Sequence, residues 1–310
     1  MPSDPARRRL RAARQLRGGV TCAALALFQA CGPAETDAPA SGGAPGGGSA
    51  APAPAATFND SHPGVQELLN APGFRWETLG GGRIRLHFQR GGYAALVAPD
   101  FQDGAEAILD EVLAVLGEEE ASRGVRIFVL DSRGEMAALT GRTDPAWWSQ
   151  ELGAVVLVFN EAERPLLRRT MAPLVATDFW GNADPWLATG LGLWFDGECV
   201  GVARPLETLP AALEAAGERV DARTLVEDWE AAEAADPFSA EVSAGGLVHF
   251  LMERYSLEAV RTLWQQGSGA VLGVTGADLD ALDAAWRAAL QAAPAPDVEL
   301  AVLRAEGGCR

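Results

Sequence analysis

Two short, strongly apolar runs lie near the middle of the chain, Val125-Arg126-Ile127-Phe128-Val129-Leu130 and Ala154-Val155-Val156-Leu157-Val158-Phe159. Runs of this length that are rich in β-branched residues are typical of buried β-strands. A third run, Arg83-Ile84-Arg85-Leu86-His87-Phe88, alternates polar and apolar residues, which predicts a strand with one buried face. Together the three runs predict a small mixed sheet in the first half of the folded part.

Helices are predicted between these strands and through the second half of the chain. Between the first two strands, apolar residues recur at the helical period, at Ile108, Leu109, Val112, Leu113 and Leu116. Further apolar stripes of helical period lie within 247–255 and 279–290. Thr275 and Asp278 are candidate N-terminal caps for the last stripe. A small mixed sheet followed by a helical half is an α+β fold.

Composition places the 310-residue chain among globular proteins, because 48% of its residues are hydrophobic and 22% are charged. Six of its 25 basic residues fall within the first 18 positions. Without residues 1–30, the chain has 19 basic against 41 acidic residues, a net charge of −22. A domain of this charge repels phosphate groups, so no nucleic-acid partner is expected.

The first thirty residues have the pattern of a secretory signal peptide. An arginine-rich segment precedes a largely apolar run of twelve residues, Gly19 to Ala30, and Cys31 follows. A membrane-spanning helix needs about 20 apolar residues, so this run is expected to be cleaved rather than to span. The residues from Leu27 to Cys31 resemble the lipobox of bacterial lipoproteins, which implies acylation of Cys31. Ordinary signal cleavage, with Cys31 incidental, is the alternative.

Residues 31–57 are expected to form a flexible tether. Of the 26 positions from 32 to 57, 22 are Ala, Pro, Gly or Ser, which is too little apolar surface for a core. A flexible chain of this length spans about 28 Å. Residues 58–310 contain no repeat and no second linker, so they are expected to form one domain.

Four cysteines are present, and two of them, Cys199 and Cys309, fall within the expected domain. In an oxidising compartment these two could form a disulfide. Two unpaired thiols are the alternative, because sequence carries no information on their distance.

One helical segment of the second half resembles a known family. Residues 186–197 read Trp-Leu-Ala-Thr-Gly-Leu-Gly-Leu-Trp-Phe-Asp-Gly. They resemble the helix of gluzincin (peptidase MA-like, thermolysin-like) zinc metallopeptidases that carries Trp-Leu-x-Glu-Gly-Leu-Ala, whose Glu is a zinc ligand. The order of elements from 83 to 178, and the segments 246–255 and 286–290, follow the same pattern. The resemblance covers most of residues 58–310 and implies a gluzincin-like architecture.

The residues that zinc catalysis needs are missing from the matching positions. Those enzymes carry His-Glu-x-x-His on a helix, because positions i and i+4 place two imidazoles on one face while the Glu activates water. The matching helix allows two registers: Thr170, Met171 and Leu174, or Met171, Ala172 and Val175. Thr189 occupies the third ligand position. The resemblance therefore implies a pseudo-peptidase, with no metal, no other cofactor and no catalytic residues.

Other residues near the lost site allow more than one interpretation. Trp186, Thr189 and Trp194 could line a groove for a peptide or glycan, whereas aromatic residues at such spacings are more often core. His87 and His249 are interpreted as packing residues. Two carboxylate pairs, Asp196 with Glu198 and Asp178 with Asp184, could act as acid and base at a relocated hydrolase site. The plainer interpretation is that these residues are solvated surface.

The sequence thus predicts an exported protein of the bacterial cell envelope that is held to a membrane by a lipid on Cys31. Its domain is expected to bind an unknown envelope protein or peptide, or to act structurally, without catalysis. The alternatives are a hydrolase with a relocated or non-zinc site and an inert scaffold, because a fold does not fix a function.

Overall fold

The computed structural model of the protein describes residues 56–199, 202, 204–293 and 298–305. All of the described residues belong to one compact unit of the chain, Ala53–Arg310. The expected signal peptide, Cys31, nearly all of the expected tether, and Cys309 lie outside the described residues.

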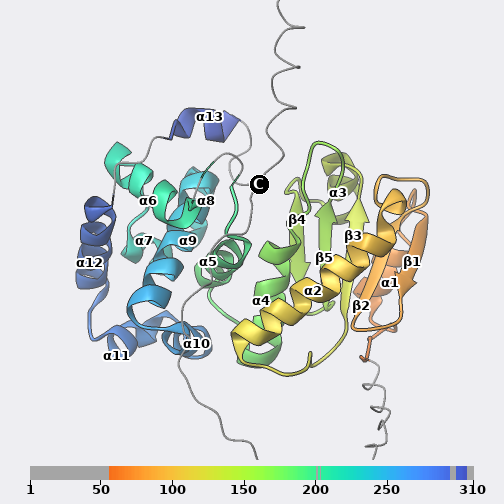
Figure 1. Ribbon diagram of the computed structural model, residues 1–310, viewed down its shortest axis with the longest axis horizontal. Helices are drawn as coiled ribbons and strands as arrows, with labels where there is room; N and C mark the ends of the chain where they lie inside the picture. Colours follow the sequence, from red (N-terminus) through yellow and green to blue (C-terminus); the bar gives the residue numbers. More distant parts are fainter. Residues whose placement is uncertain (1–55, 200–201, 203, 294–297, 306–310) are drawn as a thin grey trace, which may run out of the picture. The chain divides into compact units, whose positions relative to one another are not determined.

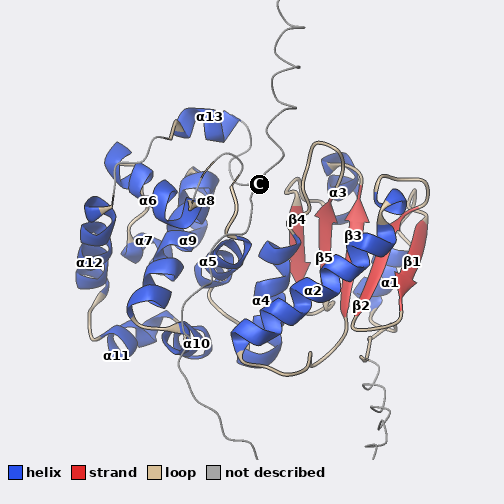
Figure 2. Ribbon diagram, viewed as in Figure 1, coloured by secondary structure: helices blue, strands red, loops and turns tan. Residues whose placement is uncertain are grey.

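A five-stranded mixed sheet forms the first half of this unit (Figure 2). Its strands lie in the order β1-β2-β3-β5-β4. The three central strands are parallel to one another: β2 (Ile84–Gln89), β3 (Val125–Leu130) and β5 (Ala154–Val158). The two outer strands run antiparallel to their neighbours: β1 (Trp76–Gly80) and β4 (Ala146–Ser149).

Helices cover both faces of this sheet, and Figure 1 shows α2 (Ala98–Leu116) lying across one of them. That face buries Ile127 and Val129 against α2 and α4 (Leu167–Trp180). The opposite face buries Phe128 and Leu130 in a second cluster with residues of two shorter helices, α1 (Pro63–Leu69) and α3 (Arg133–Thr140). Burial on both faces explains why the sequence of β3 is continuously apolar rather than alternating.

The second half is helical. Its longer helices are α5 (Pro185–Asp196), α6 (Pro205–Ala216), α9 (Pro237–Arg254), α10 (Leu257–Gln266) and α12 (Leu279–Ala292). Shorter helices connect or follow them: α7 (Ala222–Glu227), α8 (Trp229–Ala235), α11 (Val271–Thr275) and α13 (Leu300–Ala305). Two single 3₁₀ turns, η2 (Ala94–Leu96) and η3 (Ser268–Ala270), complete the described elements.

Helix α5 joins the two halves, because it packs on α4 on one side and on α9 on the other. Two glycines make this close approach possible. A Cβ atom on Gly192 would lie 2.3 Å from the Arg169 carbonyl oxygen of α4, and one on Gly190 would lie 2.6 Å from the Ala244 carbonyl oxygen of α9. The Thr-Gly-Leu-Gly sequence of this helix therefore has a packing role, whatever its resemblance to a peptidase segment implies.

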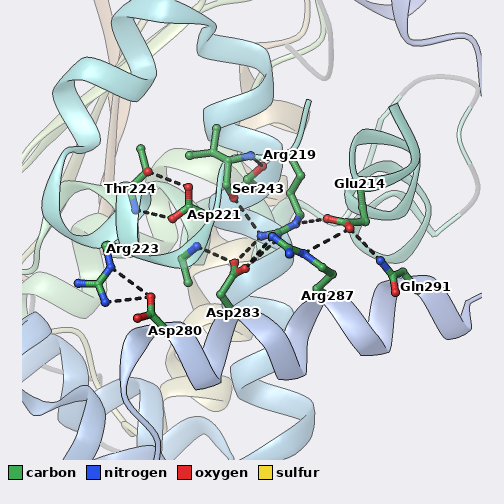
Figure 3. Close-up of polar contacts among 12 residues, drawn as sticks. Glu214, Arg219, Asp221, Arg223, Thr224, Ser243, Asp280, Asp283, Arg287 and Gln291 are labelled. Carbon is green, nitrogen blue, oxygen red and sulfur yellow. Dashed lines mark hydrogen bonds and ion pairs between the residues drawn. The ribbon is translucent and has the colours of Figure 1, made fainter. Parts of the chain in front are cut away.

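A charge network that is largely out of solvent ties α6 and α12 to the segment before α7 (Figure 3). Arg219, whose side chain is 2% exposed, bonds Glu214 at 2.7 Å and Asp283 at 2.8 Å. Asp283 also accepts a hydrogen bond from the backbone amide of Ala222. Burial acts to raise the pKa of Asp283, but hydrogen bonds from Arg219 and Ala222 and the nearby arginine charges outweigh it and lower that pKa. The network thus links α6, α12 and the segment before α7 through charge-assisted hydrogen bonds.

The α+β expectation is confirmed, as are the three strands and the main helices predicted from periodicity. The half-buried pattern expected for 83–88 holds at Arg83 and Arg85, whose side chains are partly exposed, but fails at His87, which is 3% exposed and stacks on Phe128 of the next strand. The outer strands β1 and β4 were not predicted. No helix among the described residues is both long and apolar enough to cross a membrane.

Candidate functional site

A cleft of about 180 Å³ lies where the outer strand β4 meets α4 and α5. Strand β4 and the turn before it contribute Arg142, Asp144, Trp147 and Trp148. The helices contribute the residues of the other walls, which are Leu166, Arg169, Thr170, Pro173, Ala188, Thr189, Glu233 and Glu241. The cleft therefore brings together segments from both halves of this unit.

The outer edge of β4 offers unpaired backbone groups along this cleft. The Val158 amide donates to the Pro145 carbonyl at 2.7 Å, and the register places Trp147 opposite Val156. Because hydrogen-bonded pairs alternate along an antiparallel ladder, the N–H and C=O groups of Ala146 and Trp148 point away from β5. Within the described part of the chain, no strand pairs with this edge.

Two tryptophans of β4 border the cleft, and both are half-buried. Trp148 packs with the core that α2 and α4 share, whereas Trp147 packs with the cluster on the opposite face. The Arg142 guanidinium lies 5.4 Å from the centre of a Trp147 ring, within range of a cation–π contact. The edge strand thus presents large apolar surface on both of its faces.

An ion pair lies at the base of the cleft. Arg169 of α4 bonds Glu241 of α9 at 3.0 Å, and their side chains are only 11% and 13% exposed. Asp144 and Glu233 also line the cleft, and both make further polar interactions. The charged walls therefore carry both signs, with two arginines and three carboxylates.

Most of the zinc-site positions expected on α4 do not border the cleft. Met171, Leu174 and Val175 are at most 2% exposed and belong to the core. The positions of α4 that face the cleft are instead Arg169, Thr170 and Pro173, together with Leu166 at its N-cap. The cleft-facing i, i+4 pair is therefore Arg169 and Pro173, and of the expected α4 positions only Thr170 borders the cleft.

The walls of the cleft do not fit a zinc ion. Neither arginine nor proline at the i, i+4 positions can donate an electron pair to the metal. The Thr170 hydroxyl donates to carbonyl oxygens of its own helix, at 2.9 Å to Leu166 and 3.1 Å to Leu167. Across the described residues, no group of three His, Cys, Asp or Glu side chains is arranged to hold a metal ion.

Of the three residues expected to form a groove, only Thr189 lines the cleft. Trp186 is 1% exposed and donates from Nε1 to Ser268 Oγ at 3.3 Å, so it is a core residue. Trp194 is half-buried and packs edge-on against Phe195, away from the cleft. The tryptophans that border the cleft are instead Trp147 and Trp148. The sequence analysis missed them because β4 was not predicted.

The carboxylates considered for a relocated hydrolase site have other partners. Asp178 forms two hydrogen bonds with Arg123, and Asp196 forms two with Arg164. Asp184 accepts hydrogen bonds from the amide and the hydroxyl of Ser268. These contacts join separate elements of the fold, which gives each of these three aspartates a structural role.

The remaining expected residues lie elsewhere. His87 is a packing residue, since burial, with the Arg126 and Arg85 charges adding to it, lowers its pKa to about 4. His249 is half-buried and borders a separate cavity in the helical half. Cys199 is 5% exposed and disulfide-bonded, whereas its expected partner Cys309 lies outside the described residues.

Comparison with known proteins adds no relative: the chain matches no protein-family model, and no curated protein is significantly similar to it in sequence. The assignment of a function therefore rests on the cleft.

Proposed function

We propose that this chain is an exported, lipid-anchored envelope protein whose folded domain binds an extended peptide segment, without cleaving it, along the outer edge of β4. The observation that carries the proposal is the outward-facing backbone of Ala146 and Trp148 at the wall of the cleft. An extended peptide can join a sheet by pairing with such an edge. The affinity then comes from main-chain hydrogen bonds and the specificity from pockets for alternate side chains.

The geometry of the cleft favours a peptide over a compact ligand. The outward-facing groups of Ala146 and Trp148 are two residues apart, which is about 6.8 Å along an antiparallel strand. A paired strand would meet Trp148 on one face of the sheet and Trp147 on the other. Charges of both signs at the walls, with Arg142 and Glu233 among them, suit a segment of mixed rather than uniform charge.

Two features support binding without catalysis. The Thr170 hydroxyl is engaged with carbonyl oxygens of its own helix, so no base is in place to activate it. The Glu241 carboxylate is already paired with Arg169 at 3.0 Å, a contact between α4 and α9. The gluzincin resemblance fits the same view as an inherited architecture, since α4 and α5 both border the cleft.

The parts of the proposal that concern export and membrane anchoring are supported by the sequence. The basic and apolar segments before Cys31, followed by a spacer of Ala, Pro, Gly and Ser, are the pattern of a protein tethered at a membrane surface. A domain on such a tether could capture a segment of another envelope protein within its reach of about 28 Å.

The test uses the full chain carrying Cys31→Ser, which removes the expected acylation site and the need for detergent. This protein is used to select from a library of random dodecapeptides, and the affinities of enriched peptides are then measured. Ala146→Pro removes one outward N–H and leaves every β4–β5 hydrogen bond in place, as a proline on an edge strand can. Losing one hydrogen bond of about 0.5–1.5 kcal/mol should weaken binding roughly two- to tenfold.

Ser149→Pro is the matched contrast, because the Ser149 amide points towards β5 and its loss breaks the ladder. It should lower the melting temperature, whereas Ala146→Pro should not. Failure to enrich any peptide, or equal affinity of the wild-type and Ala146→Pro proteins for the enriched peptides, would refute strand addition at β4.

A further inference from the structure

A peptide strand paired with β4 would present its side chains to two different surroundings, because successive side chains of a strand point to opposite faces of a sheet. Those on the face of Trp148 meet α4 and α5, since Trp148 packs with the core that these helices share. Those on the face of Trp147 meet the other cluster, beside Arg142. The side chain opposite Trp148 is therefore the one that the cleft can select.

The size and the apolar walls of the cleft suit one long side chain with an apolar stem. At about 180 Å³ the cleft is smaller than the roughly 300–1,000 Å³ that is usual for small-molecule sites, so it holds part of a peptide rather than a whole compact ligand. Trp148, Leu166, Pro173 and Ala188 supply the apolar wall between β4 and the helices. An aliphatic stem that packs on these residues removes apolar surface from water, which favours binding.

The charges that the helices contribute to the wall are one positive and two negative, from Arg169, Glu233 and Glu241. Arg169 and Glu241 pair at the base of the cleft and offset each other. Asp144, in the turn before β4, adds a further negative charge. The first turn of α4 also borders the cleft, but the partial charge of a helix N-terminus is only about +0.5. This wall therefore favours a cation over an anion.

The charge of the whole chain acts in the same direction. Without residues 1–30 the net charge is −22, and a field of this sign attracts positively charged segments before they make contact. At physiological ionic strength this attraction reaches about 8 Å, so contacts within the cleft decide which residue of the peptide is selected. Lysine and arginine meet both requirements of the cleft, because their apolar stems can be buried while the charged end remains among polar groups.

We propose that the peptide bound along β4 places an arginine or lysine side chain opposite Trp148, with its stem along Trp148 and Pro173 and its charged end at Glu233 and Glu241. This inference rests on the proposed peptide binding at β4 and adds the chemical class of the residue that the cleft selects. The segment recognised in a partner protein is thus extended and carries a basic residue at a fixed position.

The test begins with the peptides that the Cys31→Ser protein enriches from the random library. Most of them should share arginine or lysine at one position. Citrulline in place of that arginine, or norleucine in place of that lysine, keeps the length of the side chain and removes its charge. The neutral peptide should bind roughly three- to tenfold more weakly, an effect between those of an exposed ion pair and of a charge-assisted hydrogen bond.

Two glutamates of α8 provide matched variants of the protein. Glu233 lines the cleft and Glu230 does not, and both are exposed, so glutamine at either position leaves the core intact and changes the net charge by the same amount. In Glu233→Gln the affinity ratio between the charged and the neutral peptide should fall at least about twofold. In Glu230→Gln the ratio should match that of the protein without either change.

The outcomes separate this inference from the proposed function. If no peptide is enriched, or if Ala146→Pro leaves the affinity unchanged, peptide binding at β4 is wrong and this inference falls with it. If Ala146→Pro weakens binding but the enriched peptides share no basic position, strand pairing stands and the selection of a basic residue is refuted. Equal affinity ratios in the two glutamate variants would refute that selection as well.

Discussion

The substitution Thr189→Arg distinguishes between two environments for Thr189: the solvated wall of a binding cleft and a packed core. Thr189 is half-buried at the wall of the cleft, so a guanidinium there can remain in water, and the free energy of unfolding should change by no more than about 0.5 kcal/mol. Met171 of α4 is 0% exposed, and Met171→Arg buries an unpaired charge that should destabilise the protein by several kcal/mol. For a domain of this size each kcal/mol corresponds to about 2–4 °C in melting temperature.

The same variant should abolish peptide binding, because a long charged side chain would occupy the cleft that a paired strand needs. Blocking a central position of an interface typically costs at least about 2 kcal/mol, which is a thirtyfold loss of affinity. The assay is a peptide titration beside a thermal melt, with Thr189→Ser as the conservative control. A melting temperature that falls as far as that of Met171→Arg would show that Thr189 is core. An unchanged affinity would show that peptides bind elsewhere.

Three further predictions concern anchoring, the charge network and the disulfide. The wild-type protein should partition into the detergent phase and Cys31→Ser should not; recovery of wild type in the aqueous phase with another mature N-terminus would contradict acylation. Because the pKa of Asp283 is lowered in the folded state, its contribution is present above its unfolded pKa of about 3.9 and is lost as pH falls through the folded value. Asp283→Asn should therefore cost about 3 kcal/mol at pH 7, and urea titrations should show that difference shrinking towards pH 3; a difference independent of pH would exclude this mechanism. Leu303 of α13 and Cys199 share one small apolar cluster, which brings the C-terminal helix near Cys199. Cys309→Ser should therefore free the Cys199 thiol for labelling in denaturant without reductant and lower stability by about 2–5 kcal/mol, and a Cys199 that stays unlabelled after unfolding would rule out this pairing.

The hydrophobic pattern of the sequence correctly predicted those elements whose burial pattern is regular along their whole length. The strands β3 and β5 are buried on both faces, and continuous apolar runs of strand length identify such strands directly. Helix α12 was equally predictable, because it has one apolar stripe and its N-terminal cap is the expected Asp278, whose side chain accepts a hydrogen bond from the Ala281 amide. Thr275, the other candidate, bonds instead to the Val271 and Ala277 carbonyls.

The side of α4 that borders the cleft could not be predicted in the same way, because this helix lies between the sheet and α5 and is buried almost all around. Every residue from Thr170 to Thr177 is buried, so no polar face marks the side that borders the cleft. A shift of one or two residues in such a helix changes every expected site residue, which is why Met171 and Val175 were placed at a site and lie in the core.

Strand β4 escaped prediction for the opposite reason, since it is only four residues long, follows a proline and is half-buried throughout. Four residues are too few to show the alternation that identifies a strand. Yet β4 is the element that supplies both unpaired backbone groups and both tryptophans of the cleft. The resemblance to a catalytic family directs attention to the helices that are expected to match its ligand-bearing helices. Peptide binding without catalysis depends instead on surfaces that offer unpaired hydrogen-bonding groups and apolar contacts. The proposed surface is the edge of the sheet, so Ala146 and Thr189 are more informative positions for mutation than the expected zinc-site positions on α4.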